Sequence, residues 1–490
     1  MKSKCQFVVI LIMYFVGLNA QQNSLSAQIE LQSGYNGPNN LPYWMRANQY
    51  RSVPPAGVFA SLIASSEKEY NKTSNKIFDW GFSAEGRLNL GKPSDVILIE
   101  GYGKIRLSVF QFKAGRSKDI MGLCDTSLSS GSYIVSGTSL GIPKIEVSIP
   151  EFYIIPFFGR MFAFKGNFVH GWMGNTHKGF DTIAIVSPTY LHQKSLYGRF
   201  GIPEWKLKLY GGFNHQVVWG DEASFMGEDY TLTEFQSFLY VISGKRFNNG
   251  SIQGTRIGNQ LGTIDIGLTY DFQNFRLLLY RQSIYDAGAL YYFANIIDGL
   301  NGLSITNTSK TENKFQWQKF VIEVLYTKNQ GGEVWSYKPS HLYFENYFNN
   351  GYYREGWSYR GKSIGTPFIS PGGTIRDDLP VAPNEYFVNN RVIAFHFGVE
   401  ANISNLIIKS KISYSQNYGT YRTAAEGHED IGLIFPSPYG VFPVTNQFSG
   451  LLEGYRDLKK GFTLGFIAAA DIGDLYDNTF GLICSFVKKF

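Results

Sequence analysis

The sequence is poor in cysteine, nearly balanced in charge and free of long apolar runs after its first twenty residues. Its three cysteines, Cys5, Cys124 and Cys484, are far apart and fit neither a disulfide framework nor the spacing of zinc ligands. The formal net charge of +6 predicts no nucleic-acid partner. No apolar stretch reaches the roughly 20 residues that a membrane-spanning helix needs. These features argue against a disulfide-stapled domain, a zinc module, a nucleic-acid-binding protein and a helical membrane protein.

Aromatic residues and glycine are abundant instead. The chain contains 39 Phe, 32 Tyr, 8 Trp and 53 Gly, and aromatic residues make up 16% of it. Transmembrane β-barrels place aromatic girdles at both membrane interfaces and use glycine in turns and close strand crossings. The mean hydropathy of −0.14 is compatible with a barrel, because alternating outward apolar and inward polar residues hide the membrane-facing wall from an average.

The first residues, MKSKCQFVVILIMYFVGLNA, have the order of a secretory signal peptide. Two lysines precede an apolar run from Phe7 to Val16, and the segment ends on a small residue at Ala20. The run is ten residues long, which is too short for a membrane anchor. We therefore predict a signal peptide over residues 1–20, a mature chain from Gln21, and export.

Alternation of period two recurs along the mature chain. The segment FDWGFSAEGRLNL at 78–90 alternates apolar side chains with Asp, Ser, Glu, Arg and Asn, as a strand between lipid and a wet interior would. Further strands are predicted at 95–107, 205–213, 263–272, 275–285, 319–327, 391–400, 406–415 and 462–472. No linker divides them. We predict one all-β domain over 21–490, an outer-membrane β-barrel of about 16–18 antiparallel strands.

The C-terminal segment DNTFGLICSFVKKF is predicted to form the last strand of such a barrel. Phe480, Leu482, Cys484 and Phe486 share one face, and the aromatic Phe490 ends the chain. We interpret Cys484 as a small residue that faces lipid. The ending resembles the terminal strand that the barrel-assembly machinery recognises, so this machinery is a predicted partner.

The predicted orientation follows from the direction of this last strand. If it runs toward the periplasm, successive strands alternate in direction, and long connections belong outside the cell. Counting backward places 341–390 and 416–446 outside and the turn at 456–461 in the periplasm.

Catalytic and metal-binding patterns are weak. GTSLG at 137–141 matches G-x-S-x-G, but a hydrolase needs its serine, here Ser139, on a strand-to-helix turn, and no helical period follows. His170 and His177 are seven residues apart, without a third ligand at zinc-type spacing. Loop acids that could form a glycosidase pair are better explained by hydrogen bonding within loops: Asp125, Asp181, Asp221, Glu222 and Asp298. We predict no enzyme activity, no cofactor and no metal.

Residues 341–368 combine many aromatic side chains with Asn, Glu, Lys and Arg in a segment placed outside. Aromatic rings cover the apolar faces of sugars, and basic groups such as Lys362 pair with acidic ones. An interfacial girdle with ordinary loop folding is the equally weighted alternative. The predicted glycan-binding residues are Tyr352, Tyr353, Arg354, Trp357, Tyr359, Arg360, Trp172 and Trp219.

Several longer blocks resemble the Wzi-type capsule-assembly proteins of Gram-negative outer membranes, in their Bacteroides-like form. They include LPYWMRANQY at 41–50, DTSLSSGSYIVSG at 125–137, IPKIEVSIPEF at 142–152 and HGWMGN at 170–175. The longest blocks are YLHQKSLYGRFGIPEWKLKLYGGFNHQVVWGDE and NNGYYREGWSYRGKSIGTPF, at 190–222 and 349–368.

The resemblance implies a monomeric barrel of about eighteen strands, whose outer surface holds capsular polysaccharide on the cell without catalysis. Enteric members of the family carry an N-terminal helical plug, but residues 21–78 show no helical period. The leading hypothesis is therefore a lectin-like barrel that binds capsular or another surface polysaccharide. The alternative is a porin-like channel for sugars or small polar solutes, which inward charges such as Lys206, Lys208, Asp265 and Asp271 would suit.

Overall fold

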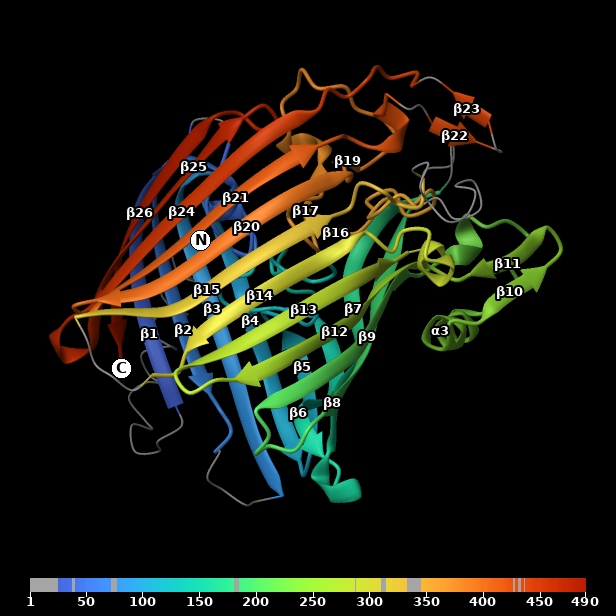
Figure 1. Ribbon diagram of the computed structural model, residues 1–490. Coiled ribbons are helices and arrows are strands. Elements are labelled where there is room, and N and C mark those ends of the chain that lie inside the picture. Colours follow the sequence, from blue (N-terminus) through green and yellow to red (C-terminus); the bar gives the residue numbers. More distant parts are fainter. Residues whose placement is uncertain are drawn as a thin grey trace, which may run out of the picture.

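The computed structural model describes residues 25–490 except 38–39, 72–76, 180–184, 287, 310–313, 333–344, 426–427, 431–432 and 436. The predicted signal peptide at 1–20 lies outside the described residues. Eighteen antiparallel strands form one sheet, and its first strand, β1 (Leu25–Asn36), pairs with its last, β26 (Thr479–Lys489). The sheet is therefore a closed barrel (Figure 1), as predicted, with a strand count at the top of the expected range.

Each barrel strand pairs with its neighbours along the chain in simple up-and-down order. The other barrel strands are β2 (Ala56–Lys68), β3 (Phe78–Lys92), β4 (Asp95–Leu107), β5 (Phe110–Arg116), β6 (Lys144–Ile154), β7 (Phe162–Lys178), β8 (Ile185–Phe200), β9 (Leu207–Trp219), β12 (Asn259–Asp271), β13 (Phe275–Tyr285), β14 (Gly299–Asn307), β15 (Phe315–Tyr326), β20 (Val392–Ile403), β21 (Leu406–Asn417), β24 (Thr445–Asp457) and β25 (Phe462–Gly473).

Where the structure describes them, the connections contain two helices, α2 (Tyr43–Arg46) and α3 (Glu234–Ser243), together with short turns of 3-10 helix. None of the described helices is long and apolar enough to cross a membrane. The connections also hold four small hairpins, β10–β11 (Arg246–Asn249, Ile252–Arg256), β16–β17 (Ser358–Tyr359, Lys362–Ser363), β18–β19 (Ser370–Pro371, Phe387–Asn389) and β22–β23 (His428–Asp430, Leu433–Phe435).

The barrel wall shows the predicted alternation. On β26, Phe480 and Phe486 are 50% and 41% exposed on the outer face, whereas Ser485 on the opposite face is buried. Cys484 is exposed on the same outer face, as predicted. Because outward residues face lipid and inward residues face protein or water, this period determines which side of each strand is apolar.

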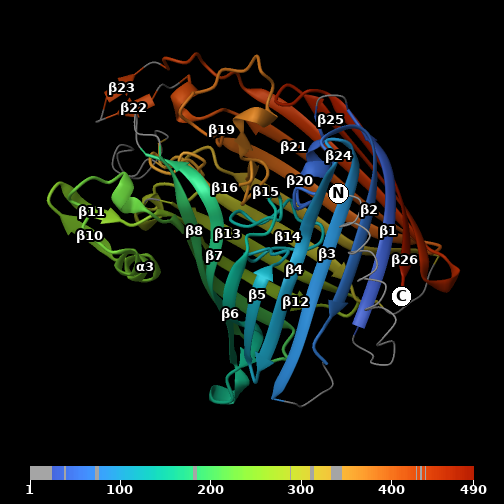
Figure 2. The same ribbon diagram turned by 180° about the vertical axis from the view of Figure 1, so that it is seen from behind.

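The two ends of the barrel differ in the length of their connections (Figures 1 and 2). The end that holds the C-terminus has short turns, such as 108–109, 272–274 and 404–405. The opposite end carries the long connections 37–55, 117–143, 220–258, 286–298, 327–391 and 418–444. Long connections belong outside the cell, so we call this the outer end. The predicted strand directions from 391 to the C-terminus agree with this arrangement.

Exposed aromatic side chains mark an interface near the outer end. Phe395, Tyr414 and Phe448 are cross-strand neighbours on β20, β21 and β24, and all three are exposed on the outer face. Near the other end, Phe78, Trp80 and Phe315 are also exposed. These two sets have the position and chemistry of aromatic girdles at membrane boundaries.

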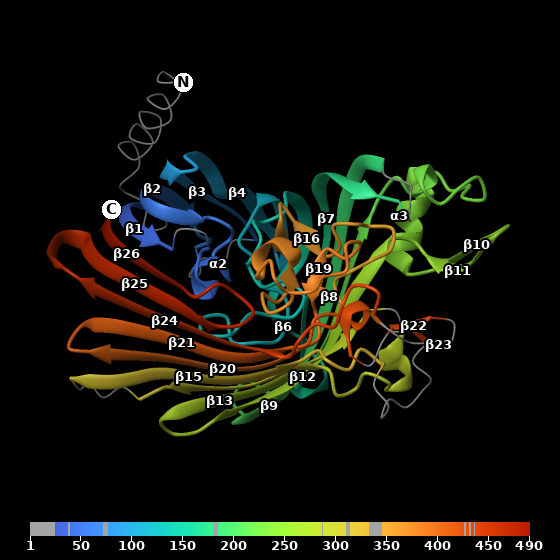
Figure 3. The same cartoon turned by 90° about the horizontal axis from the view of Figure 1, so that it is seen from above.

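The connection 117–143 folds into the barrel and crosses its interior (Figure 3). The Leu123 N–H donates to Asp265 on β12, and the Tyr133 N–H donates to Gln282 on β13. Further hydrogen bonds and one ion pair join the segment to the wall. They link Asp125 with Ser304 and Lys319, Ser129 and Ser130 with Glu323, and the Leu128 carbonyl with His396. This segment is therefore a plug that is anchored to many strands.

The connection 345–391 packs on the plug from the outer side. The Trp357 indole N–H donates to the Ile134 carbonyl at 3.1 Å, and the Thr366 N–H donates to the Tyr133 carbonyl at 2.9 Å. In the described part of residues 25–78, the one helix is the single turn α2, so an N-terminal helical plug of the enteric kind is not found there. Loops of the outer end fill the lumen instead.

Removing the Glu323 carboxylate should loosen the plug. It is buried and accepts hydrogen bonds from the Ser129 hydroxyl at 2.7 Å, the Ser130 N–H at 2.6 Å and the Tyr280 hydroxyl at 2.5 Å. Glu323→Ala leaves buried donors without a partner, which costs about 1–3 kcal/mol. We expect faster proteolytic cleavage within 117–143, measured by mass spectrometry on the purified barrel.

The control for this experiment is Glu400→Ala. Glu400 pairs with Lys409 at 3.6 Å in a partly exposed position, so its loss should change stability little. Equal cleavage rates in the two variants would show that Glu323 does not hold the plug.

Candidate functional site

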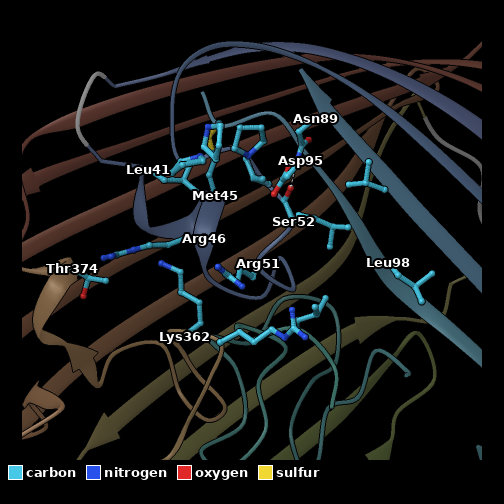
Figure 4. Close-up of a pocket in the computed structure, with 18 of the residues that line it drawn as sticks. Leu41, Met45, Arg46, Arg51, Ser52, Asn89, Asp95, Leu98, Lys362 and Thr374 are labelled. Carbon is cyan, nitrogen blue, oxygen red and sulfur yellow. Dashed lines mark hydrogen bonds between the residues drawn. The ribbon is translucent and has the colours of Figure 1, made fainter. Parts of the chain in front are cut away.

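A cavity of about 540 Å³ lies at the outer end of the barrel beside the plug (Figure 4). It is bounded by α2 and the rest of the connection 37–55, by the outer ends of β3 and β4, and by the β16–β17 hairpin. Five basic side chains line it, Arg46, Arg51, Arg116, Arg360 and Lys362, together with the acid Asp95. The cavity is therefore strongly basic.

The helix α2 is held against the inner wall, which places Arg46. The Tyr43 N–H donates to the buried carboxylate of Asp471 on β25 at 2.7 Å. The Arg46 guanidinium lies over the ring of Tyr476, 4.1 Å from its centre. Such cation–π stacking leaves the edge of the guanidinium available to a ligand.

Arg360 lies in the two-residue turn of the β16–β17 hairpin, and Lys362 is the first residue of β17. Arg360 and Gly361 have φ of 48° and 78°, the left-handed pair that a type I′ hairpin turn requires. Arg51 is also left-handed, with φ of 53°. A residue other than glycine is less stable by about 1–3 kcal/mol in this left-handed conformation. Arg51 and Arg360 therefore occupy strained backbone positions, which the surrounding packing maintains.

The cations of the cavity outnumber its single acid, Asp95, among the described lining residues. None of the five cations forms an ion pair with a residue in the described part of the chain. Asp95 accepts a hydrogen bond from Asn89, and the Arg116 Nη1 donates to the Leu98 carbonyl, whereas the buried Arg116 Nε has no partner. In Figure 4, Arg46, Arg51 and Lys362 lie near one another, and Asp95 lies on the other side of the cavity. A carboxylate or phosphate would supply the missing counter-charge.

Burial lowers the pKa of the Lys362 amine to about 8, and the positive charges of Arg46 and Arg51 add to this shift. Below pH 8 the amine is an ammonium and attracts an anion, whereas above pH 8 it becomes neutral. We expect the affinity for an acidic glycan to fall by roughly 3- to 10-fold between pH 7 and pH 9. Isothermal titration calorimetry at several pH values measures this.

The matched variant is Lys362→Arg, because a guanidinium stays charged throughout this pH range. It should bind with little dependence on pH. A pH profile that is identical in the two proteins would mean that Lys362 does not contact the ligand.

The structure does not bring the eight predicted glycan-binding residues together. Arg360 lines the cavity, and its guanidinium lies 5.7 Å from the ring of Tyr359, which is buried. Tyr353 and Trp357 are buried in the packing of the connection 345–391. The Tyr353 hydroxyl donates to Glu222, so its role in the structure is to tie two outer connections together.

The other predicted residues lie away from the cavity. Trp219 is buried against α3, and Trp172 is 43% exposed on the outer face of β7. Tyr352 is 40% exposed, 5.5 Å from the ring of Phe225, and the Arg354 Nε donates to the Gly179 carbonyl. The glycan-binding role of these residues stays a prediction, and among the aromatic ones Tyr352 and Trp172 are exposed.

Sequence reasoning missed Arg46, Arg51 and Arg116. Arg46 lies in the block LPYWMRANQY, where it is the only charged residue. These arginines are hundreds of residues from Lys362 in the chain, so no local spacing links them. The available signal was a pair of arginines in a connection that has no other charged residue.

The hydrolase pattern lacks the required geometry. Ser139 is buried in the irregular connection 117–143, with no helix after it. His177 contacts Glu355 at 2.8 Å, and His170 lies against aromatic rings. Within the described residues, no three metal-ligating side chains form a group.

Comparison of the sequence with protein-family models and with curated proteins gives no match. Among solved structures, the chain is similar to Wzi, an Escherichia coli outer-membrane protein involved in group 1 capsule assembly and described as a carbohydrate-binding β-barrel. The TM-score is 0.56 at 12% identity, and the alignment covers 98% of this chain and 87% of Wzi.

Other solved structures match with lower TM-scores. OccAB4 of Acinetobacter baumannii has a TM-score of 0.43 at 11% identity, over 96% of this chain and 100% of the other. OmpF of Salmonella typhi has a TM-score of 0.38 at 10% identity, over 95% and 97%. The fold is that of an outer-membrane β-barrel.

Proposed function

We propose that this protein is a non-enzymatic outer-membrane barrel that binds an acidic capsular or other surface polysaccharide and attaches it to the cell. The observation that carries the proposal is the cavity at the outer end, where five cations line the surface without an ion pair in the described chain. A polysaccharide bearing carboxylates or phosphates is the polymer at the cell surface that matches this charge. The description of Wzi as a carbohydrate-binding barrel supports the same conclusion.

The filled lumen favours binding over transport. The plug forms hydrogen bonds with β12, β13, β15, β20 and β21, and the connection 345–391 covers it from outside. Both segments therefore occupy the interior through which a solute would have to pass. A polymer held at the outer mouth needs no path through this interior.

We further propose how the protein is exported and assembled in the membrane. Residues 1–20 direct export and are removed, the mature chain from Gln21 forms one domain, and β26 is recognised by the barrel-assembly machinery. We propose that the barrel acts as a monomer; its closed sheet leaves no free strand edge through which a second copy could pair.

Deletion of the gene tests the proposal. We expect polysaccharide synthesis to continue while the polymer appears in the medium instead of on the cells. The measurement is polysaccharide in the washed-cell and supernatant fractions, with the wild-type gene restored as control. Unchanged retention on the deletion strain would rule out an attachment role.

A further inference from the structure

A polar patch occupies the outer, lipid-facing side of the barrel wall on β8, β9 and β12. His192 and Lys194 follow the same alternation as Leu196, which is 59% exposed on the outer face. On β9, His215 shares its face with Phe213, and its Nε2 lies 3.2 Å from the Gln260 amide oxygen on β12. Polar side chains at such positions are unfavourable against hydrocarbon, so something must cover them.

The connection 220–258 covers this patch from outside the barrel (Figures 1 and 3). The ring of Phe238 on α3 lies 5.6 Å from His170, 6.3 Å from His192 and 5.7 Å from Trp219. The Lys194 ammonium donates to the Ile242 carbonyl at the C-terminal end of the helix, at 2.5 Å. His192 and His215 are buried as a result.

The helix α3 is well defined by its ends. Thr233 and Gln236 form a capping box at its start, and Gly244 ends it with φ of 66°. Its inner face packs through Phe238 and Val241. A separate face carries Phe235 and Leu239, one helical turn apart, which are 68% and 43% exposed. The helix thus has an apolar stripe on the side that no part of the described protein covers.

The cross-strand contacts show the height of α3 along the barrel. Trp172, Tyr190 and Trp219 form one row across β7, β8 and β9, and Trp219 is the last residue of β9 at the outer end. The helix packs on this row and on the residues directly below it. Its exposed stripe therefore lies beside an aromatic row of the kind that marks a membrane boundary.

Three exposed cations lie next to the helix. Lys245 and Arg246 follow its C-terminus, and Arg256 is the cross-strand partner of Arg246 in the β10–β11 hairpin. None of them forms an ion pair with the described residues. An apolar stripe bordered by cations is the composition of a helix that lies in a membrane interface rich in anionic headgroups.

We propose that α3 and the β10–β11 hairpin form a lateral interface element that inserts Phe235 and Leu239 into the outer leaflet and pairs Lys245, Arg246 and Arg256 with the phosphates of its lipids. The element has two effects. It shields the polar patch on the wall from hydrocarbon, and it sets the depth at which the barrel, and hence its outer mouth, stands in the membrane.

Depth-dependent fluorescence quenching tests the proposal in the full-length protein. Leu239→Cys, in a Cys484→Ser background, carries an environment-sensitive fluorophore, and the barrel is reconstituted into vesicles containing lipids with a nitroxide near the headgroup. We expect a roughly twofold decrease in emission relative to vesicles without nitroxide. Asp377→Cys, an exposed position in the connection 345–391, is the control and should show no decrease.

Two further measurements decide the outcome. Phe235→Cys, labelled in the same way, should also be quenched, which guards against a local defect at position 239. Replacing Lys245, Arg246 and Arg256 by Gln should weaken quenching in vesicles that contain phosphorylated lipid A and leave it unchanged in pure phosphatidylcholine. If positions 235 and 239 behave like position 377, the helix lies in water and the proposal is wrong. If the triple variant behaves like wild type in both vesicles, the pairing with phosphate is wrong.

Discussion

Replacing Arg51, Arg360 and Lys362 together by Gln should lower the affinity for an acidic surface polysaccharide by at least about 100-fold. Each side chain lines the outer cavity, and none has an ion-pair partner within the described residues. A hydrogen bond to a charged group contributes about 1.5–3 kcal/mol, so the loss of three such bonds reaches or exceeds this factor. The measurement is binding of purified barrel to immobilised polysaccharide at fixed salt.

The choice of control matters because any loss of positive charge weakens attraction to a polyanion. Arg376→Gln removes a cation in the same outer connection, where Arg376 is already paired with Asp378 at 2.8 Å. It should leave affinity nearly unchanged. A second control is polysaccharide whose carboxylates have been reduced to alcohols, which should bind wild type as weakly as native polysaccharide binds the triple variant. Wild-type affinity in the triple variant would exclude the cavity as the binding site.

Removing the plug should convert a silent barrel into a conducting one. We expect wild-type protein in planar bilayers to show almost no current, because 117–143 and 345–391 fill the lumen. Replacing residues 121–138 by a short Gly/Ser linker removes the contacts with Asp265, Gln282 and Glu323. Conductance should then rise by at least about tenfold, since barrels of 16–18 strands enclose an aqueous channel when unfilled.

The matched deletion is 246–256, the β10–β11 hairpin, which lies outside the barrel wall (Figure 3). It shortens the chain without touching the lumen and should stay silent. Large steady currents through wild-type protein would contradict the occluded lumen and favour the porin-like alternative. This result is independent of the affinity experiment, so binding and transport are tested separately.

Most of the wall was predictable from the sequence. The segments 95–107 and 275–285 coincide with β4 and β13, and the terminal strand differs from β26 by one residue. The reason is that lipid on one side and a packed interior on the other impose an alternation of period two on every strand. Predictions at strand ends were less accurate, as at β9, which extends to Trp219, because the outer ends of strands are covered by connections instead of lipid.

The aromatic segment from 349 to 368 shows where prediction from sequence reached its limit. Its rings suited either sugar contact or folding, and the structure buries Tyr353, Trp357 and Tyr359. Trp357 contacts the plug, which lies about two hundred residues earlier in the chain, and Tyr353 contacts Glu222 of a third connection. An aromatic residue has the same local pattern whether it meets a sugar, a lipid or another loop.

The sequence by itself determined the class of fold, the faces of the strands and the end of the barrel at which long connections gather. Each of these follows from short-range alternation and from connection length. The tertiary structure alone decided that the lumen is filled by 117–143 and that Arg46, Arg51, Arg360 and Lys362 meet in one cavity. It also decided that α3 covers the outer wall. These features arise from contacts between distant connections, whose positions are set only after the barrel has closed.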